Sequence, residues 1–147
     1  MTALRILVAD DHEVVRRGLR SLLEAQSGWE IVGEAISGPE AVEKVSELHP
    51  DIIILDVNLP GFDGLEASSR IRKQEPQTEI LILTYHDSPF LVRKALEVGI
   101  RGYVLKSDAG QDLLSAVHAV RQHKFFLSSK VSKDPPREYR SAVKAGS

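Results

Sequence analysis

The fold is decided by residues 51–65, which read Asp-Ile-Ile-Ile-Leu-Asp-Val-Asn-Leu-Pro-Gly-Phe-Asp-Gly-Leu. The run up to Leu55 is apolar and rich in β-branched residues, which predicts a buried strand over 51–55. Asp56 follows directly, and the Pro- and Gly-bearing residues 58–64 predict a loop. Helical spacing of apolar residues then begins at Leu65. The stretch therefore predicts a strand, an acidic strand end, a loop and a helix.

The same order recurs along the chain. Apolar runs predict strands at 5–9, 30–34, 51–55, 79–84 and 102–105. Amphipathic patterns predict helices at 13–25, 37–48, 65–74, 89–98 and 111–122. Strands that alternate with helices imply right-handed crossover connections and a parallel sheet with helices on both faces. We therefore expect an α/β fold with a doubly wound, five-stranded parallel sheet.

Composition narrows the class of protein. The 147 residues include no cysteine, which excludes disulfides and thiolate chemistry and fits a reducing cytoplasm. No apolar run approaches the ~20 residues of a membrane span, so we expect a cytoplasmic chain without membrane contact. A formal net charge of -2 gives no basic footprint for nucleic acid, although residues 130–147 hold an excess of Lys and Arg. DNA binding by this chain alone is not expected.

The end of the chain has a different composition. Phe125-Phe-Leu127 is followed by Ser-Ser-Lys-Val-Ser-Lys-Asp-Pro-Pro at 128–136. Polar, proline-bearing sequence of this kind suits a linker better than a packed element. We expect one domain over 1–127 and a linker or tail over 128–147, too short to hold a complete DNA-binding domain.

Reactive side chains follow the predicted strands. Asp10 and Asp11 follow the first strand, Asp56 the third, Thr84 ends the fourth and Lys106 follows the fifth. The carboxyl ends of parallel strands meet at one edge of the sheet, where ligands of such folds bind. Clustered carboxylates repel one another unless a hard cation is present, and Mg²⁺ is bound by carboxylates, water and phosphate oxygens. The pattern predicts a magnesium and phosphate site.

Each of these residues also has a structural explanation. Asp10 with Glu13 could cap a helix, and Asp56 could shape its turn. Thr84 is a favourable strand residue, and Lys106 is by default a solvated amine. Any one of these explanations suffices for a single residue. Their joint occurrence at the ends of the expected strands favours a common site.

Three segments resemble receiver domains of two-component response regulators. They are Val-Ala-Asp-Asp-His-Glu-Val-Val-Arg-Arg-Gly-Leu-Arg at 8–20, Ile-Leu-Asp-Val-Asn-Leu-Pro-Gly-Phe-Asp-Gly-Leu at 54–65, and Gly-Tyr-Val-Leu-Lys at 102–106. The resemblance covers residues 4–127. When residues 116–121 and 126–128 are included, the resemblance is greatest to receivers that precede a LuxR/NarL-type helix-turn-helix domain. It implies a flavodoxin-like strand order of 2-1-3-4-5.

The resemblance also implies roles. Asp56 would accept a phosphoryl group from a phosphohistidine on a sensor histidine kinase. Mg²⁺ would be bound by Asp11, Asp56 and the backbone carbonyl of Asn58, with help from Asp10. Lys106 would pair with the phosphoryl oxygens, and this physical role agrees with charge stabilisation in phosphoryl transfer. The domain would catalyse only its own phosphorylation and dephosphorylation, and is not expected to be an enzyme in the ordinary sense.

A conformational switch is implied as well. The Thr84 hydroxyl would turn toward the phosphate and vacate space for Tyr103. The change would reach the surface of 89–98 and 102–106, where a phosphorylation-dependent homodimer could form. The output is expected to be transcription control through a DNA-binding domain outside this chain.

Two positions qualify the resemblance. The residue after Thr84 is commonly small in the family, whereas Tyr85 could restrict access to the site if its ring points inward. His86 and Asn58 are candidates for controlling the water that hydrolyses the acyl phosphate, and His86 is equally well explained as a surface residue.

Two rival functions remain open. Magnesium-dependent phosphohydrolases also use an aspartate at a strand end, but they generally need a second acid two residues later, where this chain has Asn58. A degenerate receiver that only binds partners is the other rival. Turnover of a generic phosphate ester tests the first, and failure to phosphorylate would favour the second.

Overall fold

The apolar runs of the sequence form one parallel sheet. A computed structural model of the protein describes residues 3–128. The strands are β1 (Leu4–Ala9), β2 (Trp29–Ala35), β3 (Ile52–Leu55), β4 (Glu79–Thr84), β5 (Gly102–Leu105) and β6 (Phe126–Leu127). They are hydrogen-bonded in the order β2-β1-β3-β4-β5-β6, and every neighbouring pair is parallel. The expected order 2-1-3-4-5 is confirmed.

The expected number of strands is corrected from five to six. No strand was expected after the helix predicted at 111–122, but Phe126 and Leu127 pair with Gly102 and Tyr103 of β5. The pairing covers backbone groups of β5 that a strand at the edge of a sheet would leave exposed. Packing continues through Ser128, which is buried and accepts a hydrogen bond from the Leu105 N–H. The rest of the expected tail, 129–147, lies outside the described residues.

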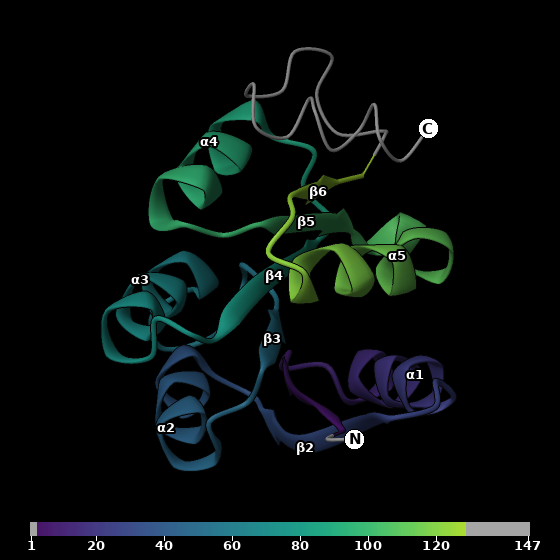
Figure 1. Ribbon diagram of the computed structural model, residues 1–147. Coiled ribbons are helices and arrows are strands. Elements are labelled where there is room, and N and C mark those ends of the chain that lie inside the picture. Colours follow the sequence, from purple (N-terminus) through teal and green to yellow (C-terminus); the bar gives the residue numbers. More distant parts are fainter. Residues whose placement is uncertain (1–2, 129–147) are drawn as a thin grey trace.

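Helices cover both faces of the sheet. They are α1 (Glu13–Glu24), α2 (Gly38–Leu48), α3 (Gly64–Gln74), α4 (Pro89–Val98) and α5 (Ala109–Arg121). As Figure 1 shows, α2, α3 and α4 lie on one side of the sheet, and α1 and α5 lie on the other. Helices on both faces require strands buried from both sides, which explains the continuous apolar runs of β3 and β4.

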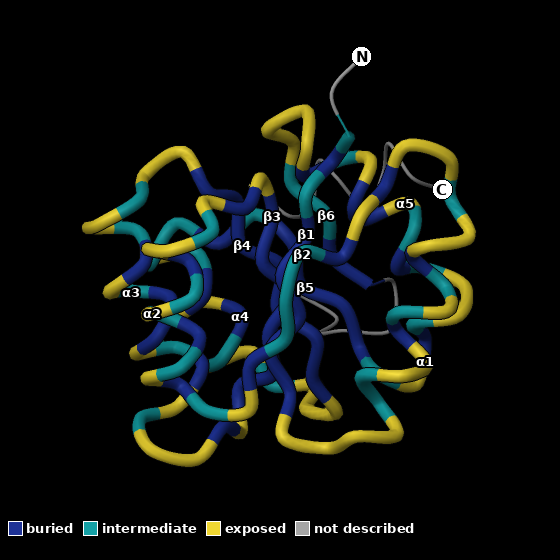
Figure 2. Tube along the Cα trace, turned by 90° about the horizontal axis from the view of Figure 1, so that it is seen from below, coloured by how far each residue is buried: buried dark blue, intermediate teal, exposed yellow. Residues whose placement is uncertain are grey.

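The core therefore has two halves, one on each face. In Figure 2 the central strands are buried while the outer turns of the helices are exposed. All four residues of β3 and all six residues of β4 are buried. Side chains of α2, α3 and α4 pack against one face, and those of α1 and α5 against the other.

Three of the helices begin after an N-cap residue whose side chain is hydrogen-bonded to the first turn. The side chains of Ser37, Asp63 and Ser88 each accept a hydrogen bond from a backbone N–H in the first turn of α2, α3 and α4, respectively. Such N-caps satisfy donors that have no partner within the helix. Pro39 and Pro89 add a backbone angle that suits a helix start. The loops that lead from β3 and β4 into helices are thus fixed by their own sequence.

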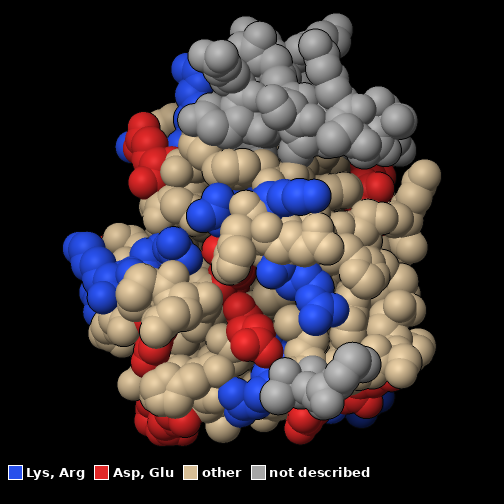
Figure 3. All heavy atoms as spheres, viewed as in Figure 1, with Lys and Arg blue, Asp and Glu red and all other residues tan. Residues whose placement is uncertain are grey.

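The surface carries no dominant charge on the face drawn in Figure 3, where acidic and basic side chains are interspersed. None of the helices within residues 3–128 has the length and apolarity needed to span a bilayer.

Candidate functional site

Three of the expected residues contact one another at the carboxyl edge of the sheet. The Lys106 Nζ lies 2.8 Å from Asp10 Oδ2 and 2.9 Å from Asp56 Oδ2. The three side chains are between 2% and 5% exposed, so this is a buried ion cluster. Lys106 is thus not the solvated amine that its residue type suggests. One ammonium is shared by two carboxylates that come from different strands.

Burial and nearby negative charge have opposite effects on the pKa of Lys106. Burial favours the neutral amine, but attraction to the carboxylates of Asp10 and Asp56 outweighs it, so the pKa of Lys106 is raised above its ordinary value. The side chain therefore stays positively charged at neutral pH. A fixed positive charge beside Asp56 is suited to stabilising the negative oxygens of a transferring phosphoryl group.

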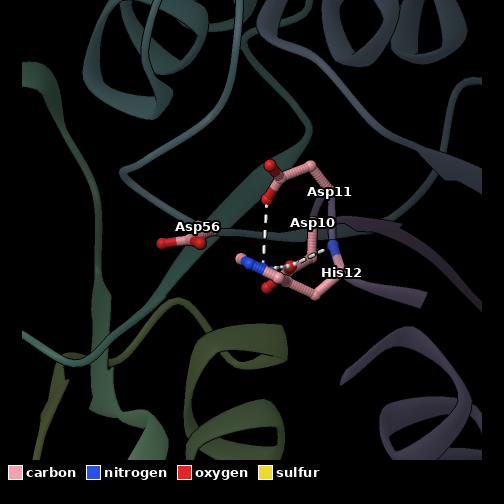
Figure 4. Close-up of side chains that lie close together, drawn as sticks. All are labelled: Asp10, Asp11, His12 and Asp56. Carbon is pink, nitrogen blue, oxygen red and sulfur yellow. Dashed lines mark hydrogen bonds and ion pairs between the residues drawn. The ribbon is translucent and has the colours of Figure 1, made fainter. Parts of the chain in front are cut away.

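The segment after β1 brings two more side chains, those of Asp11 and His12, into the site. Asp10, Asp11, His12 and Asp56 each offer one ligand atom, and these atoms lie within 4.8 Å of one another. Figure 4 shows the His12 ring beside the carboxylates of Asp10 and Asp11. The His12 Nδ1 is 3.0 Å from Asp10 Oδ1 and 3.1 Å from Asp11 Oδ1. Sequence reasoning missed His12, although its place directly after the acid pair was a signal.

The donor set fits a hard divalent cation. Three carboxylates are present, and carboxylate oxygens are the protein ligands that Mg²⁺ prefers. The buried Asp10 Oδ2 lies 2.8 Å from the Lys106 ammonium, which balances its charge. Asp11 is exposed, so its oxygens are open to an ion and its water. This acidic cluster could hold a divalent cation.

Asp56 is positioned by the loop that follows it. The Asn58 N–H donates to Asp56 Oδ1 at 3.1 Å, so Asp56 does shape its own turn. α3 begins close to the same residue, because a Cβ added at Gly64 would lie 2.1 Å from the Asp56 carbonyl oxygen. Only glycine permits this approach. The loop Asn58–Gly64 therefore determines where Asp56 and the Asn58 backbone lie.

The ends of β3 and β4 are linked across the site. The Asn58 Nδ2 lies 2.9 Å from His86 Nε2, and the His86 N–H donates to Thr84 Oγ1 at 3.2 Å. Thr84 is buried and His86 is exposed. His86 thus contacts both candidate residues on its side of the site, the hydroxyl of Thr84 and the amide of Asn58.

Two tyrosines near Thr84 have different environments. Tyr103 is buried, and its hydroxyl donates to the His86 carbonyl at 2.8 Å. Burial, followed by the negative charge of Asp87, raises the pKa of the Tyr103 hydroxyl, so it remains a donor at neutral pH. Tyr85 is 69% exposed, and the Lys106 Nζ lies 5.0 Å from the centre of its ring.

The backbone of the acid pair is hydrogen-bonded by a side chain that the sequence pattern did not predict. Arg16 on α1 donates to the Asp10 carbonyl oxygen at 2.8 Å and to Glu34 Oε1 at 2.8 Å. The helical pattern alone places Arg16 on the polar side of α1, and no local signal identifies its partners. The N-cap of α1 is His12, so the alternative in which Asp10 caps the helix is not observed.

Comparison with a family model gives a match over residues 6–118 to the response regulator receiver domain. The response regulator protein VraR of Staphylococcus aureus is 42% identical over 114 residues, which are 78% of this chain and 54% of VraR. The chain therefore spans about half the length of this curated relative.

Solved structures are similar over most of the chain. A two-component response regulator of the LuxR family from Aurantimonas sp. SI85-9A1 superimposes with a TM-score of 0.85 at 34% identity, covering 97% of this chain and 99% of the other. The RcsB response regulator of Salmonella typhimurium, from a study of DNA interaction, gives 0.83 at 30% identity, covering 88% and 68%.

Proposed function

Because this chain belongs to the response regulator receiver family, we propose that Asp56 accepts a phosphoryl group from a phosphohistidine of a sensor histidine kinase. The observation that carries the proposal is the shared contact of Lys106 with Asp10 and Asp56. Asp56 Oδ2 lies 2.9 Å from this ammonium, and ligand atoms of Asp10, Asp11 and Asp56 lie within 4.8 Å of one another. Asp10 shares the contact with Lys106 and also follows a strand, so the choice of Asp56 over Asp10 rests on the match to the receiver family.

In the proposed reaction, an Asp56 carboxylate oxygen attacks the phosphorus atom. A P–O bond forms, the P–N bond to the kinase histidine breaks, and the imidazole leaves with the electron pair. Lys106 stabilises the negative phosphoryl oxygens, since its ammonium already lies 2.9 Å from Asp56 Oδ2. Attack by water on the acyl phosphate would reverse the signal. Asn58, whose N–H donates to Asp56 Oδ1 at 3.1 Å, and His86, which lies 2.9 Å from the Asn58 amide, are candidates for affecting that water.

A divalent cation completes the site. Asp11, Asp56 and the Asn58 backbone carbonyl would bind Mg²⁺, with Asp10 beside them, and the ion would offset the repulsion between carboxylate and phosphoryl oxygens. Asp11→Ala should abolish Mg²⁺ binding in calorimetry, whereas Glu30→Ala, at an exposed acid on β2, should bind as the wild type does. Equal affinity in Asp11→Ala and the wild type would contradict this ligand set.

Phosphorylation is proposed to act through Thr84 and Tyr103. The Thr84 hydroxyl oxygen accepts the His86 N–H, and the His86 carbonyl accepts the Tyr103 hydroxyl. A phosphoryl group on Asp56 would compete with the His86 N–H for the Thr84 hydroxyl. The hydrogen bonds of His86 and Tyr103 would then change. The Tyr103 ring is already buried, so the proposed switch consists of a change in this hydrogen-bond chain and in α4.

The remaining assignments concern the whole protein. We propose that residues 1–127 act as a cytoplasmic receiver and 128–147 as a linker to a LuxR-type DNA-binding domain that controls transcription. The similarity to the LuxR-family response regulator from Aurantimonas and to RcsB supports this output, and the RcsB work concerns DNA interaction. A phosphorylation-dependent homodimer is part of the proposal. The mixed charges in Figure 3 offer no basic patch for DNA on that face.

The decisive experiment measures intact mass after incubation with Mg²⁺ and acetyl phosphate, a small phosphodonor. The wild type should gain one phosphoryl group, and Asp56→Asn should gain none. Asp51→Asn is a matched control, since Asp51 is exposed near the opposite ends of the strands. Full labelling of Asp56→Asn would refute the assignment. Sustained turnover of a generic phosphate ester would instead support the phosphohydrolase.

A further inference from the structure

We propose that Arg16 is a positioning residue for the acid pair Asp10–Asp11, and that it sets the affinity of the site for Mg²⁺. The side chain contacts none of the atoms assigned to phosphoryl transfer, so it acts through the backbone of Asp10. The inference rests on the proposed function, because it concerns how strongly the same site binds its cation.

Arg16 joins three elements behind the site. Its NH1 donates to the Asp10 carbonyl oxygen at 2.8 Å, and its Nε donates to Glu34 Oε1 at 2.8 Å. Asp10 follows β1, Glu34 lies on β2, and Arg16 itself lies on α1. The Arg16 side chain is only 16% exposed. The guanidinium is therefore held in one place by two charged or polar partners and by packing.

The bond to Asp10 fixes the orientation of the acid pair. The Asp10 carbonyl belongs to the planar peptide unit that joins Asp10 to Asp11. On the other side of Asp10, its N–H donates to the Ala35 carbonyl at 3.0 Å. With both backbone groups bound, the peptide plane has little freedom to turn. The position of the Asp11 backbone, and with it the direction in which the Asp11 side chain starts, is therefore set before any cation binds.

The chemistry of this contact favours arginine. A guanidinium presents several N–H groups in a rigid fork, so one side chain can bind a carbonyl and a carboxylate at once, whereas a lysine ammonium lacks this geometry. Glu34 also balances the positive charge, which would otherwise repel a cation. Hydrogen bonds from Arg20 and then Arg16 outweigh burial and lower the pKa of Glu34, so this balance persists at neutral pH.

The test compares two arginines of α1. Arg16→Met removes both hydrogen bonds at similar side-chain length. Arg20→Met is the matched control, because Arg20 donates to the same Glu34 at 2.7 Å but pairs with Glu24 instead of Asp10. In calorimetry with Mg²⁺, Arg16→Met should bind roughly ten-fold more weakly than the wild type, the effect of losing a group that orients a ligand. Arg20→Met should match the wild type.

A second readout separates positioning from a loss of folding. The rate of mass gain from acetyl phosphate is measured against Mg²⁺ concentration for each variant. Arg16→Met should need about ten-fold more Mg²⁺ for half its maximal rate yet reach the wild-type maximum. Arg16→Lys should lie closer to Arg16→Met than to the wild type. Urea unfolding identifies the fraction of each variant that is folded.

The outcomes are distinct. Equal Mg²⁺ affinity in Arg16→Met and the wild type would overturn the inference and leave the proposed function intact. So would an equal loss in Arg20→Met, since the effect would then belong to the packing of α1 on β2. If Arg16→Met does not fold, Arg16→Lys decides in the same way. A wild type that binds no Mg²⁺ would instead overturn the proposed metal site.

Discussion

The hydroxyl of Tyr103 donates a 2.8 Å hydrogen bond to the backbone carbonyl of His86. Tyr103 lies on β5 and is fully buried, whereas His86 lies in the exposed loop between β4 and α4. The N–H of the same His86 donates to Thr84. One residue of the loop therefore links the candidate switch hydroxyl of Thr84 to the ring beneath α4.

We expect Tyr103→Phe to keep phosphorylation and weaken the fold. The ring remains buried, but the His86 carbonyl loses its donor, which should lower the free energy of unfolding by about 1 kcal/mol. Urea unfolding measures this, and intact mass measures phosphorylation. Tyr85→Phe is the control, since Tyr85 is exposed, and its stability should not change. Loss of phosphorylation in folded Tyr103→Phe would contradict this view of its role.

Replacement of Lys106 should separate cation binding from phosphoryl transfer. In Lys106→Met the carboxylates of Asp10 and Asp56 lose their shared ammonium, so stability without Mg²⁺ should fall by about 3 kcal/mol, the cost of leaving buried charges unpaired. Mg²⁺ should bind more tightly and restore part of the stability, because it no longer competes with Lys106. Mass gain from acetyl phosphate should nevertheless be slower at saturating Mg²⁺.

The control for Lys106 is Lys94→Met on α4, where the side chain is 47% exposed and pairs with Glu97. Its stability and Mg²⁺ affinity should equal those of the wild type, because exposed ion pairs contribute little. Weaker Mg²⁺ binding in Lys106→Met than in the wild type would show that Lys106 does not compete with the cation.

The contact between Glu34 and the arginines of α1 should give a pH-dependent contribution to stability. The hydrogen bond from Arg20, followed by that from Arg16, outweighs burial and lowers the pKa of Glu34 in the folded chain. The contribution is therefore present above about pH 4.3, the usual pKa of a glutamate, and is lost as pH falls through the lower folded pKa. Glu34 is 33% exposed, which keeps the effect near 1 kcal/mol.

Unfolding of the wild type and Glu34→Gln from pH 7 to pH 3 measures this. The difference in free energy of unfolding should be constant at neutral pH and shrink in the acid range. A difference that grows as pH falls would mean that the carboxylate is not stabilised by its arginine partners.

Phosphorylation should promote self-association through α4. Phe90 on α4 is 65% exposed, and α4 follows the loop that contains His86. Phe90→Ser should weaken the association of the phosphorylated chain roughly ten-fold in sedimentation, as loss of a buried aromatic contact would. Val14→Ser, on the opposite helical layer, is the control because Val14 is 82% exposed on α1.

Two further variants test the coupling. Thr84→Ala and Lys106→Ala should lack phosphorylation-dependent association, since each removes a group that contacts the phosphate in the proposed switch. Identical association of the phosphorylated and unphosphorylated wild type would refute the dimer and leave the chemistry of Asp56 untouched. If Val14→Ser weakens association of the phosphorylated chain more than Phe90→Ser does, the interface lies on α1 instead of α4.

The sequence by itself determined the five main strands, their order through resemblance, and the residues that follow them. The reason is that burial on both faces of the sheet demands continuous apolar runs, so β3 and β4 are visible as Ile52–Leu55 and Glu79–Thr84. Strand ends are then visible as the first polar residues, which is how Asp10, Asp56 and Lys106 were recognised.

Only the tertiary structure decided how these residues meet and what supports them. The 2.8 Å contact of Lys106 with Asp10 depends on how β1 and β5 are placed in the sheet, with β3 and β4 between them. The bond of Arg16 to the Asp10 carbonyl depends on the rotation of α1. The sequence pattern also did not predict β6, because a strand of two residues has no hydrophobic periodicity. These residues form a strand because they pair with β5. Contacts between residues distant in sequence are set by packing, which local patterns do not encode.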